Sequence, residues 1–329
     1  MDPRGFPTSL PEFQAVFPTN AACAKYLEAM RWPGGFTCPK CGVQGEPYRF
    51  PSRTSVVLRC RICKATTSLT AGTVMQSTHT PLSVWFWGAY LVTTQTPGQS
   101  AMQFQRQLAL SRYETAFQIL HKLRAGMVRP ERDGIGGTGY PVEVDECNIG
   151  GRTRGEGRGV HHMATVVGAV EVRLRQKGED RAEHKRSIYA GRLRLRVVAD
   201  RSREALGRFV QDSVATGSTV RTDAWVGYDT LTSLGYRHER LAMNGDPDKA
   251  ETHLPMIHLV ISNLNTWIMG THHGAIATHH LQAYLNEYVF RFNRRFYPMT
   301  AFNSVLGLAA NSVSPTYDSL YSGQWAHPL

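Results

Sequence analysis

The chain has 329 residues, enough for two or more domains with a sizeable core. Its hydrophobic content of 42% and charged content of 19% are ordinary for a soluble globular protein, and no stretch approaches the roughly 20 apolar residues that would cross a membrane. The net charge of +11 and the pI near 9.5 favour polyanionic partners, above all nucleic acid, although an inert basic surface has the same composition.

The N-terminal part, residues 1–36, is predicted to be a short helical segment. It opens with MDPRGFPTSLPEF, which lacks the apolar core of a signal peptide, so we expect a cytoplasmic protein with reduced thiols. Apolar residues recur at helical spacing between Asn20 and Met30 and predict a helix there. Cys23 lies on its apolar face and is expected in the core.

Two cysteine pairs follow. Cys38 and Cys41 form one C-x-x-C, Cys60 and Cys63 form another, and 18 residues separate the pairs. This spacing is typical of a tetrahedral zinc site with four cysteine ligands. Four protein ligands leave no open position on the ion, so the zinc would be structural. Residues 37–78 are therefore predicted to form a zinc ribbon.

Residues 79–130 have helical periodicity. LSVWFWGAYLV is apolar almost all round and predicts a buried helix. AMQFQRQLAL and SRYETAFQILHKLRAGM predict two more helices, joined by a tight turn as in a helix-turn-helix DNA-binding domain. A helical linker bundle fits the pattern about as well. The residues that the last helix would present to DNA are Arg112, His121, Lys122 and Arg124.

From residue 138 onward, strand-like and helical segments alternate, which predicts an α/β domain with a mixed sheet flanked by helices. Glycine-rich and charged stretches between the first strands are interpreted as basic loops. The predicted strands are 142–146, 164–172, 192–198 and 218–223, with another near RHERLAM, and the predicted helices are 203–214, 256–269 and 280–294.

Two aspartates are predicted at the ends of strands. Asp145 follows VEV, and Asp223 follows VRT. Carboxylates at the ends of neighbouring strands can share divalent cations in the arrangement used for two-metal phosphoryl transfer. Such oxygen ligands suit Mg²⁺ or Mn²⁺. Each aspartate taken alone also fits a turn or a helix cap.

With these segments the chain resembles the zinc-ribbon transposases of bacterial insertion sequences (ISXO-type). The segments that carry the resemblance run from about residue 20 to residue 297. The resemblance implies an RNase H-like catalytic domain over residues 138–300, with a D-D-E or variant triad, and leaves 301–329 as a C-terminal tail. The matching segments are CPKCG with LRCRICK, SLTAGTVMQSTHTPLSVWFWGAYL, VEVDECNIGG, TDAWVGYDTL with GYRHERL, and GTHHGAIATHHLQAYLNEYVFRFNRR.

In that family the third catalytic residue lies on a late helix, and a basic residue follows two turns later. The resemblance places His258 at the acidic position and Asn265 at the basic one, so both depart from the family pattern. Seven residues correspond to nearly two turns, which puts the two on one helix face. Imidazole suits Mn²⁺ better than Mg²⁺. Glu287 and Glu251 are the rival third ligands, and a lone histidine here can also be structural.

The acidic and thiol residues next to Asp145 have no assigned catalytic role. Glu143 and Glu146 flank Asp145 and would either assist the site or be solvated. Cys147 is expected to pack beneath the site, because metal-assisted phosphoryl transfer needs no protein nucleophile.

The resemblance further implies metal-dependent cleavage at the ends of an insertion sequence, followed by strand transfer to target DNA. The zinc ribbon and the helices of 79–130 would recognise the terminal inverted repeats, and the protein would act as a nucleoid-associated homo-oligomer. The alternatives are a domesticated DNA-binding protein without catalysis, and a nuclease of this fold that cuts without joining. The basic residues expected near the scissile strand are Arg291, Arg294 and Arg295, on the last helix of the domain.

Overall fold

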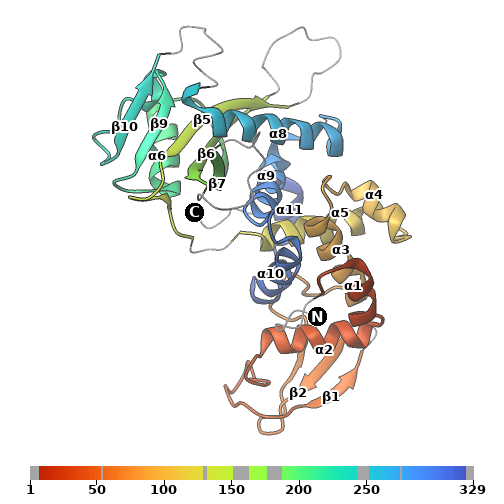
Figure 1. The fold of residues 1–329 in the computed structure, drawn as a ribbon. Helices are drawn as coiled ribbons and strands as arrows, with labels where there is room; N and C mark the ends of the chain where they lie inside the picture. Colours follow the sequence, from red (N-terminus) through yellow and green to blue (C-terminus); the bar gives the residue numbers. More distant parts are fainter. Residues whose placement is uncertain are drawn as a thin grey trace. The chain divides into compact units, whose positions relative to one another are not determined.

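The computed structural model describes residues 7–52, 55–128, 132–150, 163–175, 187–242, 252–274 and 276–323. The described residues form two compact units. The helical-ribbon unit comprises residues up to 128 together with 294–323, and the sheet unit comprises residues 132–293. Figure 1 labels their elements, and each unit is described by itself.

The helical-ribbon unit begins with two capped helices and a small sheet. The hydroxyls of Ser9 and Thr19 accept the N–H groups of Glu12 and Ala22, which fixes the starts of the first two helices. The sheet is antiparallel in the order β1-β2-β3. The elements are α1 (Leu10–Val16), α2 (Asn20–Arg31), β1 (Tyr48–Pro51), β2 (Val56–Arg59) and β3 (Thr66–Ser68).

The rest of this unit is helical and draws on both ends of the chain. α3 (Leu82–Thr94) is buried along most of its length, as its apolar sequence predicts. α4 (Ala101–Gln107) packs on α5 (Tyr113–Gly126) across a short turn, which is the helix-turn-helix-like pair. α10 (Pro298–Asn311) packs against α2, α3 and α5 and is followed by α11 (Tyr317–Ser322). Phe302 of α10 lies fully buried among the rings of Phe13, Phe17, Phe86 and Tyr90.

The sheet unit contains a five-stranded mixed sheet in the order β10-β9-β5-β6-β7. β5, β6 and β7 pair antiparallel in succession, whereas β9 and β10 run parallel to β5. This order and these directions define an RNase H-like sheet, so the predicted fold class is confirmed. The strands are β5 (Val142–Ile149), β6 (Ala164–Leu174), β7 (Ile188–Val198), β9 (Thr219–Asp223) and β10 (Arg237–Leu241).

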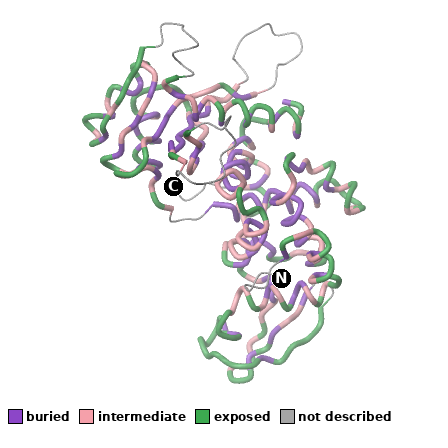
Figure 2. The backbone as a smooth tube through the Cα atoms, in the orientation of Figure 1, coloured by how far each residue is buried: buried purple, intermediate pink, exposed green. Residues whose placement is uncertain are grey.

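Helices cover both faces of this sheet. α6 (Arg203–Ser213) and the 3-10 turn η1 (Val226–Tyr228) pack on one face, and α8 (Pro255–His272) and α9 (Thr278–Phe292) pack on the other. Two buried apolar layers result, as the purple segments of Figure 2 show. A two-stranded parallel pair, β4 (Ile135–Gly136) with β8 (Val214–Ala215), lies beside the main sheet. None of the helices in the described part of the chain is both long and apolar enough to cross a bilayer.

Several predicted boundaries were wrong by a few residues, and two of the differences affect the site. β5 continues to Ile149 because it pairs with β6 along its whole length, so Asp145 lies within the strand and not at its end. α9 ends at Phe292, so Arg294 and Arg295 lie beyond this helix rather than on it.

Candidate active site

Asp145 and Asp223 are carried by neighbouring parallel strands, β5 and β9. The register pairs Val142 with Val220 and Glu143 with Arg221, and the same offset relates Asp145 to Asp223. Side chains alternate along strands, so the two aspartates belong to one face of the sheet. Each uses one oxygen locally: Oδ1 of Asp145 accepts the N–H of Glu146 at 2.9 Å, and Oδ1 of Asp223 accepts the N–H of Trp225 at 3.0 Å.

His258 reaches this pair from α8. Its Nε2 lies 3.1 Å from Oδ2 of Asp145, and both side chains are partly exposed, at 35% and 18% respectively. The hydrogen bond with Asp145 raises the pKa of His258 against the opposing effect of burial, and the charges of Glu143 and Asp223 add to the rise. A metal ion at this position would therefore compete with a proton for the imidazole.

Glu143 explains why α8 begins beside Asp145. Pro255, the first residue of α8, has no N–H, and its N-cap residue Leu254 has no side-chain oxygen. The two next N–H groups, of Met256 and Ile257, both donate to Oε2 of the fully buried Glu143, at 2.7 and 2.8 Å. A strand carboxylate thus caps a helix distant in sequence, and His258 follows directly. The sequence interpretation left Glu143 open between assisting the site and being solvated.

Glu146 projects to the opposite face from Asp145 and is almost fully buried. It accepts the hydroxyl of Tyr228 and pairs with Arg201, so it is not solvated. Burial raises the pKa of Glu146, and the hydrogen bond from Tyr228 opposes the rise. Cys147 packs against the core on the α8 side, and burial raises the pKa of its thiol to about 12.

Of the two rival third ligands, Glu287 and Glu251, the structure describes only Glu287. Glu287 is fully buried in α9 and pairs with Arg291 at 3.3 Å, which is the arginine pairing that the sequence suggested. Glu251 lies outside the described residues. Asn265 is exposed on α8, two turns after His258.

The four cysteines of the ribbon meet at one point. Sγ of Cys38 lies 3.6 Å from Sγ of Cys63, and Sγ of Cys41 lies 3.8 Å from Sγ of Cys60. A tetrahedral zinc ion with bonds of about 2.3 Å to sulfur would separate its ligands by about 3.8 Å, so the cluster fits zinc. These cysteines are the one group of three or more ligands gathered within 4.8 Å in the described part of the chain. The aspartates and His258 are arranged more openly.

The two cysteine pairs have matching backbone geometry. The N–H of Cys38 donates to the carbonyl of Val43, and that of Cys60 to the carbonyl of Ala65. The residues after the second cysteines, Gly42 and Lys64, have φ of 71° and 59°. The N–H of Cys41 lowers the pKa of the Cys38 thiol to about 6, and the N–H of Cys63 likewise lowers the pKa of Cys60. Deprotonated thiolates are the form that binds metal.

The residues predicted to contact DNA from the helix-turn-helix-like pair are placed very differently. Arg112 is exposed just before α5. Lys122 is half-buried, and burial lowers its pKa. Arg124 is only 1% exposed and donates to the carbonyl of Gln99 at 3.1 Å, so as folded it faces the core and not a ligand. His121 is also buried and stacks on Phe117.

The three arginines at and after the end of α9 differ in how far they are buried. Arg291 is largely buried, paired with Glu287, and lies over the ring of Trp267 at 5.9 Å. Arg294 and Arg295 are half-buried in the turn after α9, and Arg295 lies over the ring of Phe296.

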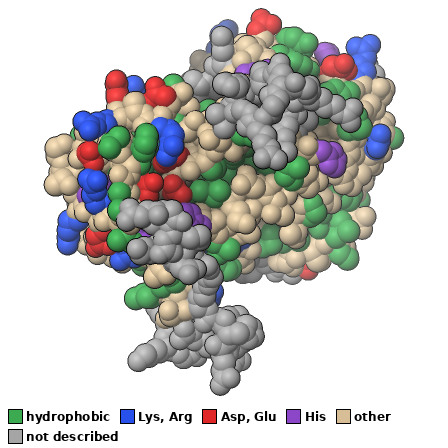
Figure 3. Space-filling model, turned by 90° about the horizontal axis from the view of Figure 1, so that it is seen from above, with side chains coloured by type: hydrophobic (Ala, Val, Ile, Leu, Met, Phe, Trp, Pro, Cys, Tyr) green, Lys and Arg blue, Asp and Glu red, His purple; other side chains and the backbone are tan. Residues whose placement is uncertain are grey.

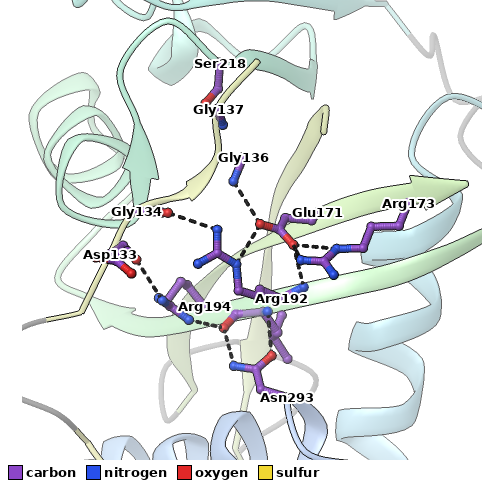
Figure 4. Close-up of polar contacts among 11 residues, drawn as sticks. Asp133, Gly134, Gly136, Gly137, Glu171, Arg173, Arg192, Arg194, Ser218 and Asn293 are labelled. Atoms are coloured by element: carbon purple, nitrogen blue, oxygen red, sulfur yellow. Dashed lines mark hydrogen bonds and ion pairs between the residues drawn. The ribbon is translucent and has the colours of Figure 1, made fainter. Parts of the chain in front are cut away.

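Another buried carboxylate, that of Glu171 on β6, accepts hydrogen bonds from protein donors on both oxygens (Figure 4). It accepts the backbone N–H groups of Gly136 and Arg192, each at 3.0 Å, and the guanidinium groups of Arg173 and Arg192. Burial raises the pKa of Glu171, but these hydrogen bonds outweigh it and lower the pKa overall. With its oxygens saturated, this cluster is structural and joins β4, β6 and β7.

Two protein-family models match parts of the chain. Residues 136–293 match the model of an ISXO2-like transposase domain, which spans the whole five-stranded sheet with α6, α8 and α9. Residues 18–66 match the model of a transposase zinc-ribbon domain, which includes all four clustered cysteines. A comparison with curated proteins finds no match to this chain.

Proposed function

We propose, since the chain belongs to the transposases with a zinc ribbon and an ISXO2-like domain, that it cleaves and joins DNA at the ends of an insertion sequence. Asp145, Asp223 and His258 would form the centre and hold Mg²⁺ or Mn²⁺. The observation that carries this assignment is the matched register of the two aspartates on β5 and β9, with the imidazole of His258 3.1 Å from Asp145.

The donor set fits a divalent ion. Two carboxylates and one imidazole supply oxygen and nitrogen ligands, and the nitrogen favours Mn²⁺ over Mg²⁺. When bound, the metal would supply activation of the attacking hydroxyl and neutralisation of charge on the phosphate.

The protein's own side chains would position the ligands and set which of them carry protons. Oδ2 of Asp145 and Nε2 of His258 would hold the ion in place of the hydrogen bond that now joins them, which would require a neutral imidazole. Glu143 keeps the start of α8, and so the imidazole, over β5. Cys147 stays protonated because burial holds its pKa at about 12, so no thiol attacks the DNA.

Sequence recognition of the inverted repeats is assigned to the zinc ribbon and the α4–α5 pair, with exposed Arg112 at the start of α5. Arg291, Arg294 and Arg295 remain proposed contacts to the scissile strand through their exposed parts, whereas Lys122 is half-buried and would contribute less. Arg124 is left out because it faces the core. Binding should weaken steeply with salt, because phosphate contacts release counterions. We propose a homo-oligomer, since two DNA ends must meet.

The test uses DNA fragments that carry the sequences flanking this gene on both sides, with a supercoiled target plasmid. With Mn²⁺, the zinc-loaded wild type should nick the ends and join them to the plasmid. Asp145→Ala should bind the same DNA and do neither. Asp212→Ala removes an aspartate that is 32% exposed, compared with 18% for Asp145, and that pairs with Arg196, and it should keep both activities.

Three outcomes would contradict the proposal. Binding without cleavage by the wild type would favour a domesticated DNA-binding protein. The specific observation that favours this alternative is that His258 stands where the family has an acidic residue. Cleavage without joining would favour a nuclease. Equal cleavage by Asp145→Ala would place the centre elsewhere.

A further inference from the structure

Trp225 is an exposed aromatic residue beside the candidate centre. It follows Asp223 by two positions, and its backbone N–H donates to Oδ1 of that aspartate at 3.0 Å. Its indole N–H donates to the carbonyl of Arg201 at 3.1 Å, which fixes the orientation of the ring. The residue nevertheless remains 39% exposed. A large aromatic surface is thus held rigidly at the edge of the site without being used for the core.

Arg201 covers one face of this ring. Its guanidinium carbon lies 4.4 Å from the centre of the indole, and the same group pairs with Glu146, the residue after Asp145. The Arg201 side chain is 43% exposed, whereas that of Glu146 is 3% exposed. The ion pair therefore ties the arginine and the ring to the strand that carries Asp145.

The close approach of these groups depends on Gly227. A Cβ atom at this position would lie 2.8 Å from Cδ1 of Trp225 and 2.8 Å from the carbonyl oxygen of Arg201. Any side chain would thus displace the indole from the loop that bears Arg201. The platform formed by Trp225 and Arg201 is consequently a built feature of two loops, β7–α6 and β9–η1.

Near the platform, exposed arginine side chains alternate with acidic ones. The Arg203 and Arg240 side chains are 60% and 52% exposed and share Asp229, which is 31% exposed. Figure 3 shows Lys and Arg side chains interspersed with acidic ones on the side of the sheet unit that carries β9 and β10. Arginines next to an exposed aromatic are the groups that hold single-stranded nucleic acid, through phosphates and stacked bases respectively.

We propose that Trp225 and Arg201 form a binding subsite for an unpaired nucleotide of the DNA strand, next to Asp223 and on the side of β5 that carries Glu146. The indole stacks on the base, and the exposed part of the guanidinium contacts the adjoining phosphate. Only a base outside the duplex stack offers a free face to the ring, so the subsite selects a frayed or extruded nucleotide at the DNA end. This inference rests on the proposed function for the role of the nucleotide, but not for its binding.

The test measures binding of the full-length, zinc-loaded protein without added Mg²⁺ or Mn²⁺. The probes are a labelled two-stranded duplex with blunt ends and the same duplex with a short single-stranded thymidine tail, and binding is followed by fluorescence anisotropy. The wild type should bind the tailed probe more tightly. Trp225→Ala should lower the affinity for the tailed probe about 5- to 150-fold at most, in line with the loss of one stacked base, and leave the blunt probe unchanged.

Two further variants separate stacking from folding. Trp225→Phe keeps an aromatic face and should keep most of the preference for the tail, whereas Trp225→Leu fills space without such a face and should lose it. Tyr140→Ala is the matched control: Tyr140 is 41% exposed and has Arg173 over its ring at 4.6 Å, but lies before β5, away from the aspartates. It should behave as the wild type does. If Trp225→Ala fails to fold, the comparison of the Phe and Leu variants decides.

A wild type with no preference for the tail would overturn the subsite, as would equal preference in the Trp225→Leu variant or an equal loss in Tyr140→Ala. The same preparations are then tested for Mn²⁺-dependent cleavage of the element's ends. Tail binding that depends on Trp225 without any cleavage leaves the subsite standing and removes the proposed function. Cleavage by a wild type whose tail binding ignores Trp225 does the reverse.

Discussion

Replacing Glu143 tests how the fold delivers His258 to Asp145. In Glu143→Ala, the N–H groups of Met256 and Ile257 lose their shared acceptor at the buried start of α8. Hydrogen bonds to a carboxylate contribute about 1.5–3 kcal/mol each, and a lost N-cap costs about 1 kcal/mol. Because water can reach part of the opened helix end, we expect a local destabilisation of about 2–4 kcal/mol.

The local stability is measured by hydrogen–deuterium exchange of the peptide spanning residues 254–262, since a chain of two units does not unfold in one step. The expected destabilisation accelerates exchange there about 30- to 700-fold, at a factor of ten per 1.4 kcal/mol. Glu239→Ala is the control, because Glu239 is 52% exposed and pairs only at the surface with Arg221. Exchange in Glu143→Ala within about threefold of the wild type would refute the capping role.

Glu143→Gln sharpens the test through pH. Burial raises the pKa of Glu143 from 4.5 to about 7, and its Oε1 has no hydrogen-bond partner within the described residues. The folded state thus binds more protons than the unfolded state between these values, so this group makes stability fall as pH rises through that window. A glutamine can accept both N–H groups while its amide occupies the Oε1 position, and it does not titrate. The variant should therefore gain stability relative to the metal-free wild type as the pH rises from about 4.5 to 7, and the difference should level off above this window.

Three further outcomes are expected. Removing zinc with a chelator should accelerate exchange across residues 37–52 and 55–66 but not in the sheet unit, because the four thiolates lose the ion that links them. Gly42→Ala should weaken zinc affinity by about 1 kcal/mol in a chelator competition, because the φ of 71° at this position is strained for any residue with a Cβ. No atom lies within 4 Å of the new Cβ, so no clash adds to this strain, and an unchanged affinity would show that the strain does not matter. His258→Glu should raise the rate of cleavage with Mg²⁺ relative to Mn²⁺, since an all-oxygen shell suits Mg²⁺, and an unaltered ratio of rates would show that residue 258 does not ligate.

The sequence was sufficient for features that depend on local pattern. Segments rich in strand-forming residues predict β6 and β7, and the spacing of Cys38, Cys41, Cys60 and Cys63 predicts their cluster, because both depend on short-range geometry. The apolar face of α8 was also predictable from its periodicity, and its members pack in the core against the sheet.

Features that depend on tertiary partners were not predictable in this way. Arg124 has the sequence context of an exposed recognition residue, yet it is buried because the carbonyl of Gln99 accepts from it. The predicted end of β5 at residue 146 was wrong because pairing with β6 extends the strand. The tail after residue 300 carries no motif, yet α10 supplies Phe302 to the core of the helical-ribbon unit.

At the candidate site the same division holds. The predicted strand ends pointed to Asp145 and Asp223, and the family resemblance added His258. The register of β5 with β9 relates the two aspartates, and His258 of α8 contacts Asp145. The role of Glu143 was left open between assisting the site and being solvated, and Trp225 was not identified as a functional residue. Glu143 shares a strand face with Asp145, which is a usable signal once a helix is known to start there. Nothing in the sequence indicates that Arg201 covers the ring of Trp225.

The most direct test of the metal centre is anomalous X-ray diffraction from crystals of the protein soaked with Mn²⁺. We predict an anomalous peak at bonding distance from carboxylate oxygens of Asp145 and Asp223 and from a nitrogen of His258, with the hydrogen bond between His258 and Asp145 broken. Manganese bound elsewhere, or an imidazole still hydrogen-bonded to Asp145 beside a bound ion, would contradict the assignment of His258 as the third ligand.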